Sequence, residues 1–334
     1  MNIQKLFAEH AMRELFHKHP VVYVDAGAAG GIAPLWRAIL AWTRIIGFEP
    51  DSQEHAWLME HPEGVDPLYL AVGLSRQKDL LDFFHARDST KSSLLKPNRA
   101  FIDKFSAAQR NDIIAVQKTS VDSLDHQLAL HNTPDVDFIK IDVQGTELWI
   151  LEGALKTLAG GVYGLEIEVS FAERYLEQPL FWEVDRFMQE QGFELLDLRL
   201  YYWKRAIGEY LGGWKGQPVI GKTLYVLDTK KFIDRAQAMK DQTQRKAKVV
   251  KAITILLLYG YIDVALEVSR ASAGIFAGEE RQALEQFLDS VRAMPFRERL
   301  PFQRTIGAVL MRVLKKLETQ RIKKMRQSTY LGNL

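Results

Sequence analysis

Cysteine is absent from the 334 residues of this chain. Its absence excludes disulfides, thiolate metal sites and a cysteine nucleophile, and it suits a reducing compartment. Long apolar runs are absent too: the most apolar stretch, residues 252–262, is 11 residues long, whereas a membrane-spanning helix needs about 20. The first 20 residues have the spacing of an amphipathic helix and lack the pattern of a signal peptide. We therefore expect a cytoplasmic protein that does not cross a membrane.

Neither sign of charge dominates the whole chain, because the formal net charge is only +2. The two signs are nevertheless unevenly placed. Residues 231–334 carry 20 Lys and Arg against 10 Asp and Glu, whereas the preceding residues carry 24 against 32. Such a change of sign along a chain is typical of two modules. We predict an N-terminal helix over 1–20, a main domain over 21–230 and a basic helical region over 231–334.

Seven short apolar segments predict the strands of a sheet. Several of them are almost continuously apolar, as expected where helices cover both faces of a parallel sheet, and amphipathic helical patterns lie between them. This alternation predicts an α/β fold with an open, doubly wound sheet. The predicted strands are residues 21–25, 44–49, 68–72, 137–142, 163–169, 193–199 and 222–228.

Two regions depart from this alternation. Residues 74–112 are polar and too long for a simple connection, which indicates a functional loop or an added hairpin. From about residue 231 the strand pattern stops, and helices are predicted with breaks near Gly274, Gly278 and Pro295.

The segment VVYVDAGAAGG, residues 21–31, runs from a predicted strand into a loop of glycine and alanine. Ligands of open α/β sheets bind beyond the carboxyl ends of the strands, and small residues let a ligand approach the backbone N–H groups there. The Asp25 carboxylate could accept hydrogen bonds from an ammonium group, directly or through water. The spacing of Gly27, Gly30 and Gly31 differs from that of dinucleotide loops, and Asp25 would repel a pyrophosphate. A cationic nucleoside without phosphates, such as S-adenosylmethionine, fits this loop better.

Glu49 stands at the tip of the second predicted strand, 22 residues after Gly27. An acidic residue about 20 residues beyond a glycine turn commonly binds the ribose hydroxyls of a nucleotide cofactor. Asp25 and Glu49 are therefore predicted to hold opposite ends of one nucleoside. The alternative, a tight strand-to-helix turn without a ligand, does not account for an acidic residue at this distance.

The segment DFIKIDVQGTELWILEGA, residues 137–154, predicts a central strand, a turn at Gln144 and Gly145, and a helix from about Glu147. Asp142 would lie at the carboxyl end of that strand, beside the cofactor. Its alternative role is that of a helix cap or a turn residue.

These segments resemble the FkbM-type S-adenosylmethionine-dependent methyltransferases. The most specific matches are FIKIDVQGTELWILEGA at 138–154 and LEIEVSFAERY at 165–175. Gln144 stands where an acidic residue is frequent in the family, and Ala29 stands where a glycine could be. The resemblance covers about 21–228 and does not extend to the helical region beyond it. Further matches are VDAGAAGG at 24–31, GFEPD at 47–51, AVG at 71–73, SSL at 92–94 and TSVDSLD at 119–125.

The resemblance implies the class I methyltransferase fold, a seven-stranded, mostly parallel and Rossmann-like sheet, with S-adenosylmethionine as the cofactor. It also implies methylation of a hydroxyl, often on a sugar or on a natural product that carries one. Asp142 would lie near the methionine part, and Val72 and Gly73 would border the adenine. The residues implied to contact the cofactor are Asp25, Gly27, Ala28, Gly31, Glu49, Pro50, Val72, Gly73 and Asp142.

A hydroxyl is a weak nucleophile, so a general base is expected beside the methyl donor, where it contributes about 10²–10⁴-fold to the rate. Asp142 is one candidate. In LEIEVSF, strand alternation places Glu166 and Glu168 on one face of the sheet, and Glu168 is favoured because it lies nearer the strand end. Alternatively, Glu168 is a structural carboxylate paired with a cation such as Lys140. We predict catalytic roles for Asp142 and Glu168.

Other ligands and functions were weighed against this prediction. Asp142 and Glu168 could hold Mg²⁺ against a sugar diol, but no dense cluster of metal ligands indicates a metal site. An NAD-dependent sugar-nucleotide oxidoreductase or epimerase would need a Tyr-x-x-x-Lys pair after a central strand, and none is found. A non-catalytic scaffold acting through the helical region is the second alternative, and it would have no use for the acidic residues at the strand tips.

Basic and apolar residues alternate over residues 301–334, which predicts a basic amphipathic helix. Such a helix would pack against its own domain, dock peripherally on an anionic surface such as membrane headgroups or an acidic glycolipid, or join copies into a homo-oligomer. No nucleic acid partner is expected, because no recognised binding motif accompanies the charge. The predicted partner is a saccharide or glycoconjugate acceptor. The basic residues of the pattern are Arg312, Lys315, Lys316, Lys323 and Lys324.

Overall fold

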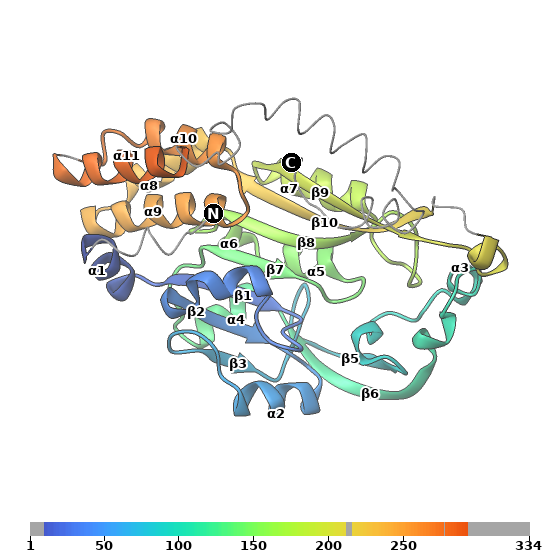
Figure 1. The fold of residues 1–334 in the computed structure, drawn as a ribbon. Helices are drawn as coiled ribbons and strands as arrows, with labels where there is room; N and C mark the ends of the chain where they lie inside the picture. Colours follow the sequence, from blue (N-terminus) through green and yellow to red (C-terminus); the bar gives the residue numbers. More distant parts are fainter. Residues whose placement is uncertain (1–9, 212–215, 277, 293–334) are drawn as a thin grey trace, which may run out of the picture.

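The computed structural model describes residues 10–211, 216–276 and 278–292. Its central feature is a seven-stranded sheet with helices on both faces (Figure 1). Each of the seven segments predicted as strands coincides with one of these strands. They are β1 (Val21–Ala26), β2 (Thr43–Phe48), β3 (Leu68–Leu70), β7 (Phe138–Ile141), β8 (Gly164–Ser170), β9 (Phe193–Trp203) and β10 (Gln217–Leu227).

The strand order is β3-β2-β1-β7-β8-β10-β9. Neighbouring strands from β3 to β8 run parallel, and β10 runs antiparallel to both β8 and β9. The order reverses between β1 and β7, which is where ligands of open α/β sheets bind. The predicted fold, a doubly wound and mostly parallel sheet, is confirmed.

The helices begin where the sequence supplies an N-cap. Asp51, Asp228 and Asp241 each accept a backbone N–H bond at the start of a helix, which satisfies donors that the helix itself leaves free. The helices around the main sheet are α1 (His10–Lys18), η2 (Pro34–Trp42), α2 (Ser52–Glu60), α4 (Leu124–Leu130), α5 (Glu147–Glu152), α6 (Leu155–Ala159), α7 (Phe181–Glu190), α8 (Thr229–Ala238), α9 (Gln242–Leu258), α10 (Ile262–Ala271) and α11 (Glu279–Arg292).

Helix α9 belongs to the main hydrophobic core. Its residues 247–257 are all buried, and its apolar members form one cluster with those of β1, β7 and β8. At its end Tyr259 stacks on Phe138 with ring centroids 5.6 Å apart, and Trp36 lies 4.9 Å from the same Phe138 ring. The apolar run at 252–262 comprises the buried end of α9, a turn and the first residue of α10.

A buried group of three charges joins α9 to the start of β7. The Asp137 carboxylate is fully buried and accepts hydrogen bonds from the ammonium groups of Lys248 and Lys251 and from the backbone N–H of Val22. The described part of the C-terminal region is helical, as predicted, but it shares its core with the sheet. The domain division at residue 230 stays a prediction, and the basic helix predicted at 301–334 lies outside the described residues.

The region predicted as a loop or hairpin, residues 74–112, contributes β5 to a second, three-stranded sheet in the order β4-β6-β5, whose middle strand β6 follows that region. We call it, with its short helices, the insertion lobe; its helix α3 lies beside the far ends of β9 and β10 (Figure 1). A small core of Phe105, Val219 and Ile220 joins the lobe to that hairpin. Its elements are β4 (Gly73–Leu74), β5 (Asp79–Ala86), η3 (Ser89–Lys91), α3 (Arg99–Ile102), η4 (Ala108–Asn111) and β6 (Ile113–Asp122).

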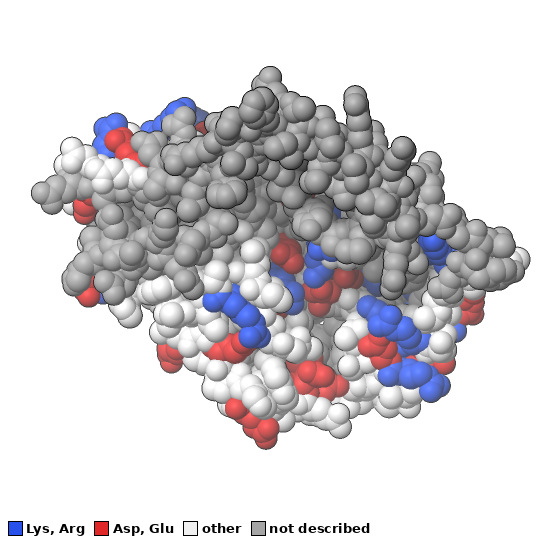
Figure 2. Space-filling view, in the orientation of Figure 1, with Lys and Arg blue, Asp and Glu red and all other residues white. Residues whose placement is uncertain are grey.

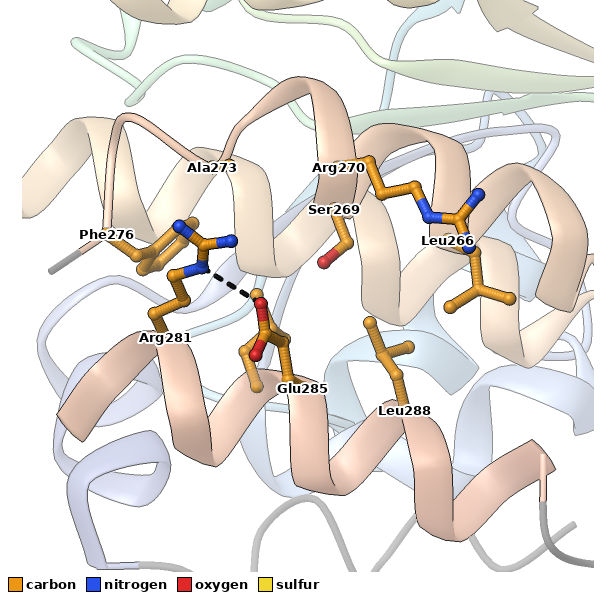
Figure 3. A pocket seen from close by; sticks show the side chains of 9 residues that line it. Leu266, Ser269, Arg270, Ala273, Phe276, Arg281, Glu285 and Leu288 are labelled. Atoms are coloured by element: carbon orange, nitrogen blue, oxygen red, sulfur yellow. Dashed lines mark hydrogen bonds and ion pairs between the residues drawn. The ribbon is translucent and has the colours of Figure 1, made fainter. Parts of the chain in front are cut away.

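Helices α10 and α11 enclose a pocket of about 300 Å³ (Figure 3). Arg281 and Glu285 lie one turn apart at its rim and are bonded to each other at 2.9 Å, and Leu266 and Leu288 close its apolar end. None of the predicted site residues lines it. Of the helices in the described ranges, none is both long and apolar enough to span a bilayer.

Candidate active site

A row of alternating charges crosses the sheet on the face that α9 covers. The strand register places Asp25 of β1 beside Lys140 of β7, and Lys140 beside Glu166 of β8. Residues in register share a face, so the row is negative, positive, negative. The Lys140 ammonium donates to Asp25 Oδ1 at 2.8 Å and to the Gly27 carbonyl at 3.1 Å, and Tyr259 donates to Glu166 at 2.8 Å.

Lys140 therefore forms its ion pair with Asp25, and the prediction from sequence that it could pair with Glu168 is wrong. Although burial opposes it, the nearby carboxylates of Asp25 and Asp142 raise the pKa of Lys140, which stays charged. Asp25 is only 1% exposed, and its Oδ2 accepts no hydrogen bond from the described residues. Its predicted contact with an ammonium group thus depends on this second oxygen.

The glycine loop follows β1 and lies directly on the end of β7. Gly27 has φ of +82°, and a Cβ there would lie 2.2 Å from the Asp142 carbonyl oxygen, so only glycine fits. The Gly27 and Ala28 N–H groups both donate to the Phe48 carbonyl, at 3.1 and 3.2 Å. These two donors are thus used by the protein itself, contrary to the expectation that they face a ligand.

Beyond this point the loop opens outward. Gly30 also has positive φ, +78°, and a Cβ there would meet nothing within 4 Å. Its N–H has no partner in the described part of the chain. Gly31 is constrained differently, because a Cβ there would lie 2.6 Å from the Glu63 carboxylate, which accepts the Ile32 N–H at 2.8 Å.

Glu49 lies at the end of β2 and faces the same loop. Its Oε2 accepts the Ala29 N–H at 3.1 Å and its Oε1 accepts the Asp51 N–H at 2.9 Å, so each oxygen keeps a lone pair for another donor. Burial is the main cause that raises the pKa of Glu49 to about 7. The structure therefore places the predicted ribose carboxylate beside the glycine loop.

The residues predicted to border the adenine lie at the base of the insertion lobe. A Cβ on Gly73 would lie 3.7 Å from Pro50, and 3.0 Å from Val121 of β6, so Gly73 is enclosed by both. Val72 is half-buried and packs against the main core. Pro50, which follows Glu49 in the chain, is thus close to Gly73, and Val72 directly precedes Gly73.

Asp142 and Glu168 are brought together at the carboxyl ends of β7 and β8. The side-chain amide of Gln144 donates to Asp142 Oδ1 and to Glu168 Oε1, at 3.0 Å in each case. An acidic residue at position 144 would place a third carboxylate here. The departure from the family pattern thus replaces a repulsive group with a donor that joins the two carboxylates.

Glu168 is held by a buried cation. The Arg174 guanidinium donates to Glu168 Oε1 at 2.7 Å, and both side chains are less than a tenth exposed. Burial raises the pKa of Glu168 and Asp142 adds to the effect, although Arg174 opposes it. Both bonds fall on Oε1, so within the described chain Oε2 is left to accept a proton.

Asp142 is paired with a cation as well. The Lys222 ammonium from β10 donates to Asp142 Oδ2 at 3.1 Å and lies 3.8 Å from Glu166. Burial alone would raise the pKa of Asp142, but nearby cations lower it, and Lys222 has the largest effect among them. Asp142 is therefore a fixed negative charge, whereas Glu168 is the carboxylate with the higher proton affinity.

The turn that carries Gln144 has an unusual backbone conformation and makes several hydrogen bonds. Gln144 has φ of +62°, which a non-glycine residue rarely adopts, and strained backbone of this kind clusters at functional sites. Its carbonyl accepts from the Ser93 hydroxyl at 2.7 Å, and Glu147 accepts the Gly145 N–H. Burial raises the pKa of Glu147 to about 7.

Charged side chains of both signs lie in the hollow between the main body and the insertion lobe (Figure 2). The described residues contain no group of three or more His, Cys, Asp or Glu placed to hold a metal ion. The candidate site is therefore built from carboxylates paired with Lys and Arg.

Sequence reasoning did not find Lys222, Arg174 or the bridging role of Gln144. Lys222 could have been found, because it is a lone cation in the otherwise apolar segment KTLYVL. Arg174 lies in the matched segment FAERY, and its pairing with Glu168 depends on a turn that periodicity does not reveal.

The seven-stranded sheet has the topology of the class I methyltransferase fold. A family model of the methyltransferase FkbM domain matches residues 25–195, just over half of the chain. The chain belongs to the FkbM methyltransferase family, whose cofactor is S-adenosylmethionine. No curated protein matches this sequence.

Several solved structures are similar to this chain at low sequence identity and low TM-score. A methyltransferase FkbM from Methylobacillus flagellatus is 12% identical with a TM-score of 0.34; the match covers 61% of this chain and 43% of that protein. The magnesium protoporphyrin IX methyltransferase ChlM from Synechocystis, with bound S-adenosylmethionine, is 9% identical with a TM-score of 0.32, covering 68% and 79%. TrmK from M. capricolum, in complex with S-adenosylhomocysteine, is 7% identical with a TM-score of 0.31, covering 84% and 97%.

Proposed function

We propose that the protein methylates a hydroxyl group of a saccharide or glycoconjugate precursor, with S-adenosylmethionine as the methyl donor. The observation that carries the proposal is the pair of carboxylates at the ends of β7 and β8, in which Glu168 keeps one oxygen free. When bound, the cofactor supplies an electrophilic methyl group on a sulfonium. The protein must supply a place for it, an aligned hydroxyl and an acceptor for the hydroxyl proton.

The residues at the strand tips fit such a cofactor. The open space and the unpaired N–H at Gly30 leave room for a ligand beside the loop, and Glu49 retains acceptor capacity for two ribose hydroxyls. Asp25, fixed by Lys140, would attract the ammonium end through Oδ2 or water. Ala28 and Gly73 add no bulk next to these groups.

Glu168 is suited to take the proton of the acceptor hydroxyl. A general base works best when its pKa lies near the operating pH, and burial moves Glu168 in that direction. Arg174 and Gln144 hold its Oε1, so that Oε2 has a fixed position. Asp142, kept ionised by Lys222, would orient this group and stabilise positive charge nearby.

The test is a screen of candidate glycans for a mass gain of one methyl group. We expect a product with S-adenosylmethionine and none with Glu168→Gln. Titration calorimetry should show binding of S-adenosylmethionine and no binding of NAD. Binding of NAD alone would overturn the proposal in favour of an oxidoreductase.

Glu49→Ala should weaken S-adenosylmethionine binding by about 10–100-fold, because hydrogen bonds to a charged group contribute about 1.5–3 kcal/mol each. The wild-type affinity should also fall as the pH drops below about 7, where Glu49 takes up a proton. Calorimetry at pH 6 and pH 8 measures both effects. Glu60→Ala, an exposed acid on α2, is the control, and equal affinities in all three proteins would remove the ribose assignment.

Asp142→Asn should lower the turnover number by about 10–100-fold while changing cofactor affinity far less. Asparagine can still accept the Gln144 bond, but it removes the charge that faces Lys222. Steady-state kinetics and calorimetry separate the two effects. Asp135→Asn, at an exposed position before β7, is the control; an equal loss of turnover and of affinity would make Asp142 a binding residue only.

A further inference from the structure

The insertion lobe contributes one lysine to the candidate site. Lys91 ends the short helix η3, and its carbonyl accepts from the Tyr175 hydroxyl at 3.0 Å. The following Ser93 donates to the Gln144 carbonyl at 2.7 Å, and the Asn98 N–H donates to the Arg174 carbonyl at 2.7 Å. The segment 91–98 is therefore bonded both to the Gln144 turn after β7 and to the Arg174–Tyr175 segment after β8.

The Lys91 ammonium lies beside the acidic cluster without an ion pair. It is half-buried, and the charges that act on it are those of Glu168, Arg174, Asp142 and Asp88. Within the described ranges, no carboxylate oxygen lies within 4.0 Å of it. Lys91 Nζ is not among the buried side-chain atoms that lack a partner in the described ranges, so it is open to solvent and can exchange water for an anion of a ligand.

The other cations of the site already have hydrogen-bond partners within the described residues. Lys140 is bonded to Asp25 and Gly27, Arg174 to Glu168, and Lys222 to Asp142. Lys91 is thus the one cation of this described group that has no carboxylate in contact. It also comes from the insertion lobe, whereas Lys140 and Lys222 come from strands of the main sheet.

We propose that Lys91 binds an anionic group of the acceptor, a carboxylate or a phosphate or sulfate ester close to the methylated hydroxyl. The hydroxyl would meet Glu168, and the anion would supply Lys91 with the close partner that the residues of the described ranges do not. This deepens the proposed function and rests on it, because the acceptor must lie between Lys91 and Glu168. A neutral sugar would leave the ammonium unpaired, so the geometry selects acidic glycans over neutral ones.

The test measures anion binding at constant ionic strength, with inorganic phosphate and acetate as separate probes. Thermal unfolding of the full chain, with and without S-adenosylhomocysteine, is followed as each anion replaces chloride. The variants are Lys91→Met, Lys91→Gln and Lys91→Arg, and Lys78→Met, at an exposed position of the same lobe, is the matched control. Unfolding temperatures in chloride show that each variant folds.

Wild type, Lys91→Arg and Lys78→Met should gain stability with at least one anion, and Lys91→Met and Lys91→Gln should bind it about tenfold more weakly. A response to phosphate identifies a phosphate or sulfate ester, and a response to acetate identifies a carboxylate. Equal responses in wild type and Lys91→Met would overturn the proposal. Failure of the proposed function would appear separately, as no binding of S-adenosylhomocysteine with the anion response intact.

Discussion

Glu168→Gln should lower the turnover number by about 10²–10⁴-fold, the range typical of losing a general base. The substitution is narrow, because glutamine keeps an oxygen at the position of Oε1, where Arg174 and Gln144 donate. It replaces the oxygen that is free to take a proton and removes the negative charge. Cofactor affinity should stay close to that of the wild type, whereas the unfolding temperature should fall, because Arg174 would stay buried without an opposing charge.

The turnover number of the wild type should also depend on pH. Burial raises the pKa of Glu168 above the ordinary value of a glutamate, and a base acts only when it is ionised. Activity should therefore be lost as the pH falls through this raised pKa, and the loss should be absent from the residual activity of Glu168→Gln. Glu190→Gln, at the exposed end of α7, is the control. A variant at position 168 with full turnover would remove the assignment.

Asp137→Asn should lower the free energy of unfolding by about 3–5 kcal/mol, the usual cost of removing one partner from a buried ion pair. The cost arises because Lys248 and Lys251 would stay buried without an opposing charge. Urea unfolding monitored by circular dichroism measures this difference. Glu280→Gln breaks the more exposed pair that Lys246 of the same helix makes, and should cost less than about 1 kcal/mol.

The pH dependence of the free energy of unfolding is a second test of the ion pairs of Asp137. Burial alone would raise the pKa of Asp137, but the ammonium groups of Lys248 and Lys251 lower it below its ordinary value. Its contribution to stability should be present above the pKa of an unfolded aspartate, about 3.9. It should be lost as the pH falls through the lower pKa of the folded protein. A stability unchanged by Asp137→Asn would mean that α9 is held to the sheet by apolar packing alone.

The sheet was predictable because buried parallel strands are short, apolar and separated by helical patterns. The same regularity placed Asp25, Glu49 and Asp142 at strand tips, since the end of an apolar run marks the end of a strand. The helical character of residues 229–292 was predictable from the loss of that pattern.

The pairing of charges was not predictable in the same way. The partner of Lys140 on β7 is Asp25 on the neighbouring strand β1. This pairing depends on strand order and register and not on the residues next to Lys140 in the sequence. The bond from Arg174 to Glu168 depends on the turn after β8. The bond from Lys222 on β10 to Asp142 at the end of β7 crosses the intervening strand β8. The excess of positive charge after residue 230 suggested a separate module, yet two of those lysines are buried against Asp137.

The small core at the edge of the molecule affects how an acceptor can enter. Phe105 of the insertion lobe packs edge-on against Trp203 of β9 with ring centroids 5.4 Å apart, and the Ala206 N–H donates to the Lys104 carbonyl. The wall that carries Lys91 is thus attached at its far side to the last hairpin of the sheet. Widening the entrance would require that hairpin to bend, so admission of a bulky glycan would be resisted by the stiffness of two long strands rather than by a freely hinged flap.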